Sequence, residues 1–159
     1  MRRSPPKRRK ARRILVLSGP NLQLLGTREP AIYGNETLDG VYARVADRAK
    51  ELGVEVETFQ SNHEGALLDR IGNARGVFDG MLLNAGALTH TSLALFDAIK
   101  ATDLPTVEVH LSNPEAREAY RQKSVLAPAC IAKVSGFGGD SYVLALDGLV
   151  RWLQAKKKR

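Results

Sequence analysis

Short apolar runs and helical repeats alternate along this chain from residue 14 to residue 153. Aliphatic-rich runs bounded by Gly, Pro, Asn and Asp predict five strands, at 14–17, 54–59, 78–83, 105–109 and 131–134. Apolar residues at helical spacing predict helices at 37–52, 61–74, 90–101 and 142–153, and a further helix with proline at its first position after Asn113. The chain therefore has the alternation expected of an α/β domain.

The regular alternation of strands and helices predicts a parallel sheet covered on both faces. At 159 residues the chain is too short for an eight-stranded α/β barrel. We therefore expect a flavodoxin-like doubly wound three-layer sandwich with a five-stranded parallel sheet. In such a sheet a ligand binds beyond the carboxyl ends of the strands, near the point where the strand order reverses.

Local signals mark several element boundaries. Ser61-x-x-Glu64 has the spacing of a capping box that opens the second helix, and His63 beside it is interpreted as a helix cap. Gly53 is expected to end the first helix. Gly136-Phe-Gly-Gly139 could form an anion-binding nest, but it lacks dinucleotide-binding spacing, so a tight turn is the favoured interpretation.

The net charge of +7 is concentrated at the two ends of the chain. We expect a disordered basic tail at 1–13, a single catalytic domain at 14–155 and a basic tail at 156–159; without the tails the net charge is −5. The tails could give weak, salt-sensitive adhesion to polyanions, but they do not predict a specific nucleic-acid reader. The lone Cys130, with no export signal and no membrane-length apolar run, is typical of a cytoplasmic protein.

The loop at 19–34 follows the first predicted strand and is long for a strand-to-helix connection. It carries Asn21, Arg28 and Tyr33 among Gly and Pro residues, a composition typical of an active-site lid. An arginine beside a tyrosine matters chemically, because a guanidinium favours the phenolate over the phenol. The alternative is a mobile surface loop.

Other polar residues follow the third and fourth predicted strands. Glu108 and His110 are two apart, so they lie on one face of an extended strand, where a carboxylate can orient an imidazole as a general acid. A buried ion pair that satisfies a core histidine is the alternative. Asn84 and His90 follow the third strand, and His90 could cap a helix or bind an anion. The histidines lack partners at metal-ligand spacing, so no metal is expected.

Four blocks of residues resemble one family, the type II 3-dehydroquinate dehydratases. The blocks are Gly19-Pro-Asn-Leu-x-Leu-Leu-Gly-Thr-Arg-Glu-Pro-x-x-Tyr-Gly34, Gln60-Ser-Asn-His-Glu-Gly65, Asn84-x-Gly-Ala-x-Thr-His-Thr-Ser92 and Glu108-Val-His-Leu-Ser-Asn113. The resemblance implies a flavodoxin-like, cofactor-free enzyme, typically a dodecamer built from trimers. It also implies the dehydration of 3-dehydroquinate to 3-dehydroshikimate through an enolate, the third step of the shikimate pathway.

The resemblance also implies roles for individual residues. Tyr33 would remove the proton beside the substrate ketone, and Arg28 would lower its pKa and stabilise the transition state. Asn21 would hold the water that steadies the enolate. His110, oriented by Glu108, would protonate the departing hydroxyl. Asp97 would reach a neighbouring subunit's site, and the positions that match substrate-binding residues are Asn84, His90, Leu111, Ser112 and Arg121.

Four positions depart from the usual pattern of the family, namely Ser18, Gln23, Ala85 and Glu115. None of them removes a proposed catalytic group. Two other functions remain open from the sequence. One is an anion- or nucleotide-binding module that uses 136–139, and the other is a polyanion-binding protein that acts through its tails.

Overall fold

A computed structural model describes residues 10–27, 29–33 and 35–157 of the chain. Its five strands are all parallel and pair in the order β2–β1–β3–β4–β5. Their bounds are β1 Arg13–Ser18, β2 Glu55–Gln60, β3 Gly80–Asn84, β4 Thr106–His110 and β5 Ala132–Ser135. This order is that of a flavodoxin-like doubly wound sheet, so the predicted fold class is confirmed.

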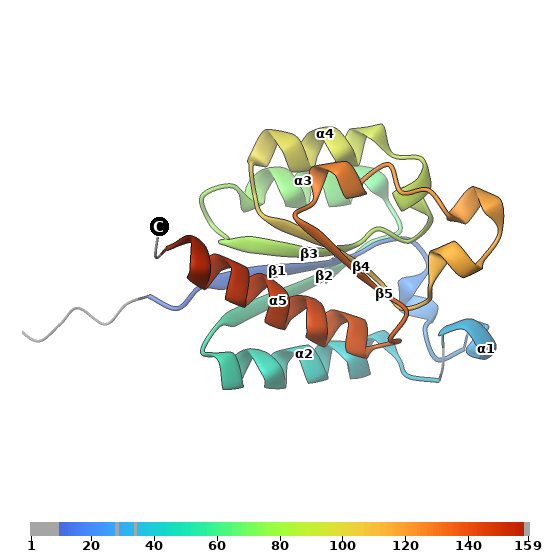
Figure 1. The fold of residues 1–159 in the computed structure, drawn as a ribbon, viewed down its shortest axis with the longest axis horizontal. Helices are drawn as coiled ribbons and strands as arrows, with labels where there is room; N and C mark the ends of the chain where they lie inside the picture. The colour runs from blue at the N-terminus through green and yellow to red at the C-terminus, as the bar shows by residue number, and fades with distance from the viewer. Residues whose placement is uncertain (1–9, 28, 34, 158–159) are drawn as a thin grey trace, which may run out of the picture.

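Helices α2, α3, α4 and α5 cover the two faces of the sheet (Figure 1). On one face lie α2 (Leu38–Leu52) and α5 (Asp140–Lys156), and on the other lie α3 (Glu64–Ala74) and α4 (Leu93–Thr102). Ile14 and Val16 of β1 belong to the core beneath α2 and α5, while Leu15 and Leu17 belong to the core beneath α3 and α4. A strand buried on both faces has no polar side, which explains its continuous apolar run.

The connections contain short helical turns. These are α1 Pro30–Tyr33 and the 3-10 turns Leu22–Leu24, Gly86–His90, Pro114–Ala116, Ala119–Arg121 and Ala127–Ala129. None of the helices in the described part of the chain combines the length and apolar character that a bilayer crossing requires.

The first predicted helix agrees with α2 at both ends. The Thr37 hydroxyl accepts a hydrogen bond from the Gly40 amide at 3.1 Å and caps its first turn. Gly53 follows the last helical residue in the left-handed conformation, where glycine carries no steric penalty.

The capping box predicted at Ser61 and Glu64 is wrong. Helix α3 begins at Glu64 with His63 at the N-cap position, and the His63 side chain makes no capping hydrogen bond. The Ser61 hydroxyl instead accepts from the His63 amide at 3.0 Å, which closes a turn before the helix. The Glu64 carboxylate accepts a hydrogen bond from the Ser92 hydroxyl, so it links α3 to the start of α4.

Three other helix predictions need correction. His90 ends a 3-10 turn, and α4 begins only at Leu93 because the Ser92 hydroxyl caps it by accepting from the Leu95 amide at 2.9 Å. The helix expected after Asn113 is a single 3-10 turn with Pro114 at its first position. The last helix is longer than the predicted 142–153, running over Asp140–Lys156.

Three hydroxyl groups join the end of β1 to both helices on one face. Ser18 is fully buried there. The Tyr42 hydroxyl of α2 donates to Ser18 Oγ at 2.6 Å, and Ser18 Oγ shares a 3.0 Å hydrogen bond with the Tyr142 hydroxyl of α5. Burial raises the pKa of Tyr42 to about 12, and it raises the pKa of Tyr142 well above its ordinary value, with a hydrogen bond from Asn84 among the smaller opposing effects. Both phenols therefore stay neutral and remain available as donors.

The ends of β1 and β3 approach each other closely beside this cluster. The Gly19 amide donates to the Asn84 carbonyl at 2.8 Å. A Cβ added at Gly19 would lie only 2.6 Å from the Ala85 carbonyl oxygen, so a side chain there would force the two backbones apart. Glycine at this position therefore allows the ends of β1 and β3 to lie in direct backbone contact.

Replacing Ser18 by alanine tests the hydroxyl cluster. Ser18→Ala removes the nearer of two acceptors of the Tyr42 hydroxyl, leaving the Phe59 carbonyl at 3.4 Å, and one partner of the fully buried Tyr142. We expect the free energy of unfolding, measured by urea denaturation, to fall by about 1–3 kcal/mol, since buried hydroxyls lose hydrogen bonds without gaining water. Among the described residues, the exposed Thr27 hydroxyl bonds only the Leu24 carbonyl of its own turn. Thr27→Ala should therefore change the free energy of unfolding by less than about 0.5 kcal/mol. Equal losses in the two variants would contradict this account of the cluster.

Candidate active site

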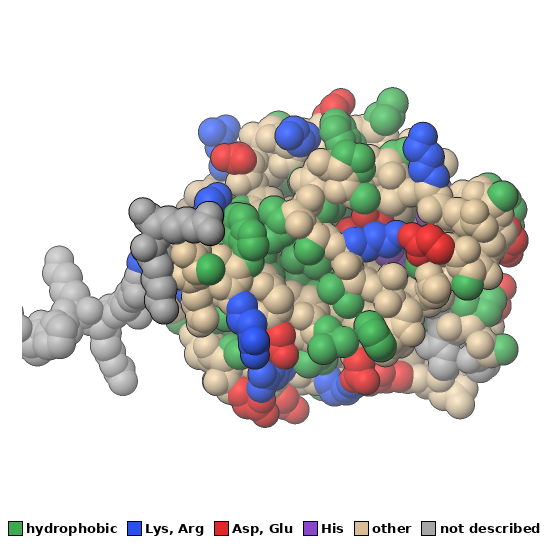
Figure 2. Space-filling view, in the orientation of Figure 1, with side chains coloured by type: hydrophobic (Ala, Val, Ile, Leu, Met, Phe, Trp, Pro, Cys, Tyr) green, Lys and Arg blue, Asp and Glu red, His purple; other side chains and the backbone are tan. Residues whose placement is uncertain are grey.

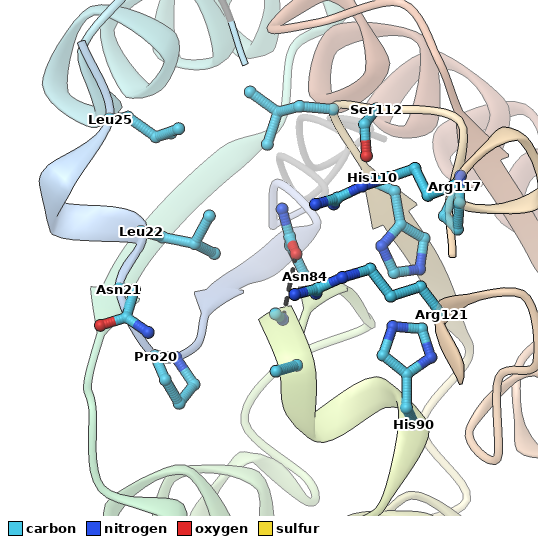
Figure 3. A pocket seen from close by; sticks show the side chains of 14 residues that line it. Pro20, Asn21, Leu22, Leu25, Asn84, His90, His110, Ser112, Arg117 and Arg121 are labelled. Carbon is cyan, nitrogen blue, oxygen red and sulfur yellow. Dashed lines mark hydrogen bonds between the residues drawn. The ribbon is translucent and has the colours of Figure 1, made fainter. Parts of the chain in front are cut away.

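A cavity of about 230 Å³ opens at the carboxyl ends of β1, β3 and β4 (Figure 3). It lies where the strand order reverses between β1 and β3, the position at which doubly wound sheets bind their ligands. Its described lining comes from the last residues of β3 and β4 and from the connections after β1, β3 and β4. It comprises Pro20, Asn21, Leu22, Leu25, Asn84, Gly86, Ala87, His90, His110, Leu111, Ser112, Pro114, Arg117 and Arg121.

His110 and Glu108 form the close contact that their spacing predicts. His110 Nε2 lies 2.6 Å from Glu108 Oε1, and the Glu108 side chain has no exposed surface. Because Nε2–H donates to the carboxylate, the ring is held in one orientation with its other nitrogen, Nδ1, on the opposite edge. The His110 ring lies beside Arg117 and Arg121 at the cavity wall (Figure 3).

The second oxygen of Glu108 ties the loop after β4 to the sheet. Glu108 Oε2 accepts a hydrogen bond from the Ser124 hydroxyl at 2.9 Å. Ser124 Oγ in turn accepts from the amides of Leu126 at 3.1 Å and Ala127 at 3.0 Å. One buried carboxylate therefore positions both the histidine in the cavity and the segment that returns to β5.

Two residues that follow β3 enter the cavity with defined partners. Asn84 is almost fully buried, and its Oδ1 accepts from the Gly86 amide at 3.2 Å, which fixes the amide plane. His90 Nδ1 lies 2.8 Å from the Lys123 carbonyl. A carbonyl can only accept, so Nδ1 carries a proton, and in the neutral ring Nε2 is then a free acceptor.

Two guanidinium groups reach into the cavity from the loop after β4 (Figure 3). Arg121 was predicted as a substrate-binding residue, and its Nε lies 3.3 Å from Glu118. Arg117 lines the same cavity and was not predicted. No local pattern in the sequence indicates it, because residues 117–121 do not form a continuous helix that would place the two arginines on one face. Two cations next to Ser112 and Asn84 suit a ligand that carries a carboxylate and hydroxyl groups.

The connection after β1 forms the wall opposite these arginines (Figure 3). Asn21 has a left-handed backbone, with φ of 69°, which asparagine tolerates better than most residues. The backbone amide of Asn21 donates to Asn62 Oδ1 at 2.9 Å. Gln23, one of the departures from the family pattern, accepts from Gln60 Nε2 at 3.1 Å, and the same nitrogen lies 3.2 Å from the Gly19 carbonyl. Gln23 therefore has an ordered partner within the wall.

Three predicted site residues are not placed in the cavity. Arg28 lies outside the described residues, and so does the side chain of Tyr33, whose backbone ends α1. Asp97 is exposed on α4 and is absent from the cavity lining. Leu111 and Ser112, in contrast, line the cavity directly after β4.

Neither Cys130 nor the turn at 136–139 provides a further catalytic or anion-binding site. Cys130 is half-buried, and burial together with the charge of Glu108 raises the pKa of its thiol to about 12. In the turn at 136–139, the Phe137 amide donates to Ser141 Oγ and the Gly138 amide donates to the Leu111 carbonyl. These amides are used internally, which disfavours the anion nest. Within the described ranges, no three His, Cys, Asp or Glu side chains gather closely enough to hold a metal ion.

Comparisons with known proteins give one consistent result. A family model described as dehydroquinase class II matches residues 12–150. A 3-dehydroquinate dehydratase of Geotalea daltonii is 58% identical over 137 residues, covering 86% of this chain and 95% of the relative. One of Prochlorococcus marinus is 55% identical over 145 residues, covering 91% and 97%. The crystal structure of a type II dehydroquinase from Butyrivibrio crossotus superposes with a TM-score of 0.86 at 42% identity, covering 87% of this chain and 97% of that one. With its fold, its cavity and these similarities taken together, the chain belongs to the dehydroquinase class II family.

Proposed function

We propose that this protein is a 3-dehydroquinate dehydratase, which removes water from 3-dehydroquinate to give 3-dehydroshikimate through an enolate intermediate, as the third step of the shikimate pathway. The observation that carries the proposal is the buried Glu108–His110 pair at the wall of a cavity that also holds Asn84 and Arg121. The names of the relatives support the identity of the substrate.

His110 is the proposed general acid. Elimination of water needs a proton on the departing hydroxyl, and an imidazolium is the side chain suited to supply it near neutral pH. The Glu108 carboxylate, 2.6 Å from the ring and shielded from solvent, keeps the imidazole oriented and would lie beside the positive charge of the ring when it carries the proton to be donated. Nδ1, which Glu108 does not engage, would then be the nitrogen that donates the proton.

Tyr33 is the proposed base, with Arg28 lowering its pKa and Asn21 holding a water beside the enolate oxygen. The loop that carries these residues already forms the cavity wall through Asn21, Leu22 and Leu25. A guanidinium next to a phenol stabilises the phenolate, and it can also stabilise negative charge that develops on the substrate.

The remaining lining residues are proposed to bind the substrate. Arg121 would take the carboxylate or a hydroxyl, with Arg117 beside it, while Asn84, His90, Leu111 and Ser112 would contact the ring hydroxyls. None of the described lining residues is a lysine, so a mechanism through a lysine imine has no amine in the walls that the structure describes. This supports the enolate route.

The first test is an ultraviolet assay for the conjugated enone of 3-dehydroshikimate, with chelator-treated protein and 3-dehydroquinate. The wild-type protein should form the enone. Removing either proton-transfer group, by His110→Asn or Tyr33→Phe, should lower kcat by about 10²–10⁴-fold while circular dichroism shows an intact fold.

His63→Asn is the matched control, because this histidine stands outside the cavity lining and makes no capping hydrogen bond. It should keep close to wild-type turnover. Absence of enone from folded wild-type protein would reject the function, and near-normal rates in His110→Asn or Tyr33→Phe would reject the mechanism.

Glu108→Gln tests whether proton donation by His110 depends on the negative charge of Glu108 or only on its hydrogen bond to the ring. The amide keeps the shape of the side chain but cannot stabilise an imidazolium, so we expect kcat to fall by about 10²-fold. Ser124→Ala removes the hydroxyl from Oε2 but leaves the charge of Glu108 in place. Its kcat should fall less than tenfold. Equal losses in the two variants would assign Glu108 a structural role only.

We also propose a homododecamer built as a tetramer of trimers, a cytoplasmic location and a single domain over 14–155 flanked by basic tails. Asp97 would contribute to a neighbouring subunit's site. Asp97 and Leu93 are four apart on α4, so they share one helix face, and Leu93 is 68% exposed despite being apolar. This face is suited to contact with another subunit.

Light scattering coupled to size-exclusion chromatography tests the assembly. The wild-type protein should elute as a dodecamer, and Leu93→Asp should shift it toward smaller species because a charge would be buried at the contact. Lys50→Asp, an exposed change on α2, is the control and should leave the mass unchanged. A monomeric wild-type protein with full activity would refute both the assembly and the role of Asp97.

A further inference from the structure

Asn84 presents its side-chain amide to the candidate active site from the last position of β3. Only 3% of this residue is exposed, so the hydrogens and lone pairs of its amide need partners in the protein or in a ligand. The Gly86 amide donates to Asn84 Oδ1 at 3.2 Å. This contact identifies the oxygen end of the side chain and leaves the two hydrogens of Nδ2 to find partners elsewhere.

The strand register shows toward which face of the sheet the Asn84 side chain points. Ser18 and Asn84 are paired residues at the ends of β1 and β3. The pair formed by Val16 and Leu82, two residues earlier, packs in the core beneath α2 and α5. Because side chains alternate along a strand, Ser18 and Asn84 lie on this same face of the sheet.

Tyr142, the third residue of α5, reaches this pair from the covering helix. The helix crosses the face shown in Figure 2, where charged side chains lie among apolar ones, and Tyr142 is fully buried on its inner side. The Tyr142 hydroxyl shares a 3.0 Å hydrogen bond with Ser18 Oγ. Burial raises the pKa of this hydroxyl, and a hydrogen bond from the Asn84 side chain is among the smaller effects that oppose the rise. Since Oδ1 faces the Gly86 amide, Nδ2 is the end of Asn84 that donates to Tyr142.

The turn at 136–139 holds the start of α5 against the loop that follows β4. The Gly138 amide donates to the Leu111 carbonyl at 2.9 Å, and the Gly139 carbonyl accepts from the Tyr142 amide at 3.2 Å. Leu111 lines the active-site cavity. The backbone therefore keeps Tyr142 at a fixed place behind the cavity wall, although the Tyr142 side chain is not part of the lining.

We propose that Tyr142 is a positioning residue for the dehydratase reaction, whose hydroxyl holds the Asn84 amide in the orientation that binds a hydroxyl group of the substrate. The inference rests on the proposed function, because it uses the substrate-binding role of Asn84. With Oδ1 bonded to Gly86 and one Nδ2 hydrogen bonded to Tyr142, the second Nδ2 hydrogen is left for the substrate. An amide that is held at both ends is ordered before the substrate arrives, which lowers the entropic cost of binding.

The test compares two variants that each lose one hydroxyl of the same cluster. Tyr142→Phe keeps the ring that fills the core but removes one restraint on Asn84, so KM for 3-dehydroquinate should rise about 3–10-fold while kcat stays within about threefold of wild type. Tyr42→Phe is the matched control, because the described bonds of its hydroxyl go to Ser18 Oγ and the Phe59 carbonyl. Both variants should lose stability to urea, and circular dichroism checks that both are folded. Only Tyr142→Phe should raise KM.

A double-mutant cycle with Asn84→Ala shows whether Tyr142 acts through Asn84. In the Asn84→Ala background, Tyr142→Phe should change KM by less than about twofold, because no amide is left to orient. An unchanged KM in Tyr142→Phe, an equal rise of KM in Tyr42→Phe, or the same rise in both backgrounds would overturn the proposal while leaving the proposed function intact. Absence of turnover in the folded wild-type protein would reject the proposed function and this proposal together.

Discussion

A fully buried carboxylate, Glu108, is the constraint on which the candidate site depends. Removing a carboxylate from water costs several kcal/mol unless donors replace the lost hydration. His110 and Ser124 supply those donors, one to each oxygen. The segment from 111 to 131 has little regular structure of its own, and these two contacts help to anchor it, together with the bonds of the Lys123 carbonyl to His90 and of the Val125 amide to the Thr89 carbonyl. The contacts that satisfy this buried carboxylate therefore also hold the histidine and part of the loop that line the cavity.

The fold was predictable because each strand and helix shows its pattern of apolar residues along its whole length. In β1 each residue from Ile14 to Leu17 is apolar, since both faces of the strand are buried, and α2 shows helical spacing between two ordinary caps. The positions of Asn84, His90 and His110 followed from the same prediction. In a parallel sheet all strands end at one edge, so polar residues after successive strands must lie close together.

The wrong capping-box prediction and the missed Arg117 share a different cause. Ser61 and Glu64 have the spacing of a capping box, but Glu64 is instead bonded to Ser92 of α4, a tertiary contact that no local pattern contains. Arg117 was missed because its position is set by the anchored segment after β4 and not by any periodicity. Local spacing predicts local hydrogen bonds, and it does not reveal when a distant residue competes for the same group.

The thiol of Cys130 can serve as a natural chemical probe of the segment that Ser124 anchors. Burial and the nearby charge of Glu108 raise its pKa to about 12, so almost none of it is thiolate near neutral pH and alkylating reagents have little to attack. The residue stands just after the segment that Ser124 anchors, and its Sγ donates to the Leu126 carbonyl. We therefore expect alkylation to be slow while the segment keeps this contact and faster when it opens. The rate of labelling at Cys130 would then report the local opening equilibrium of the segment that shapes the cavity, without any probe introduced by mutation.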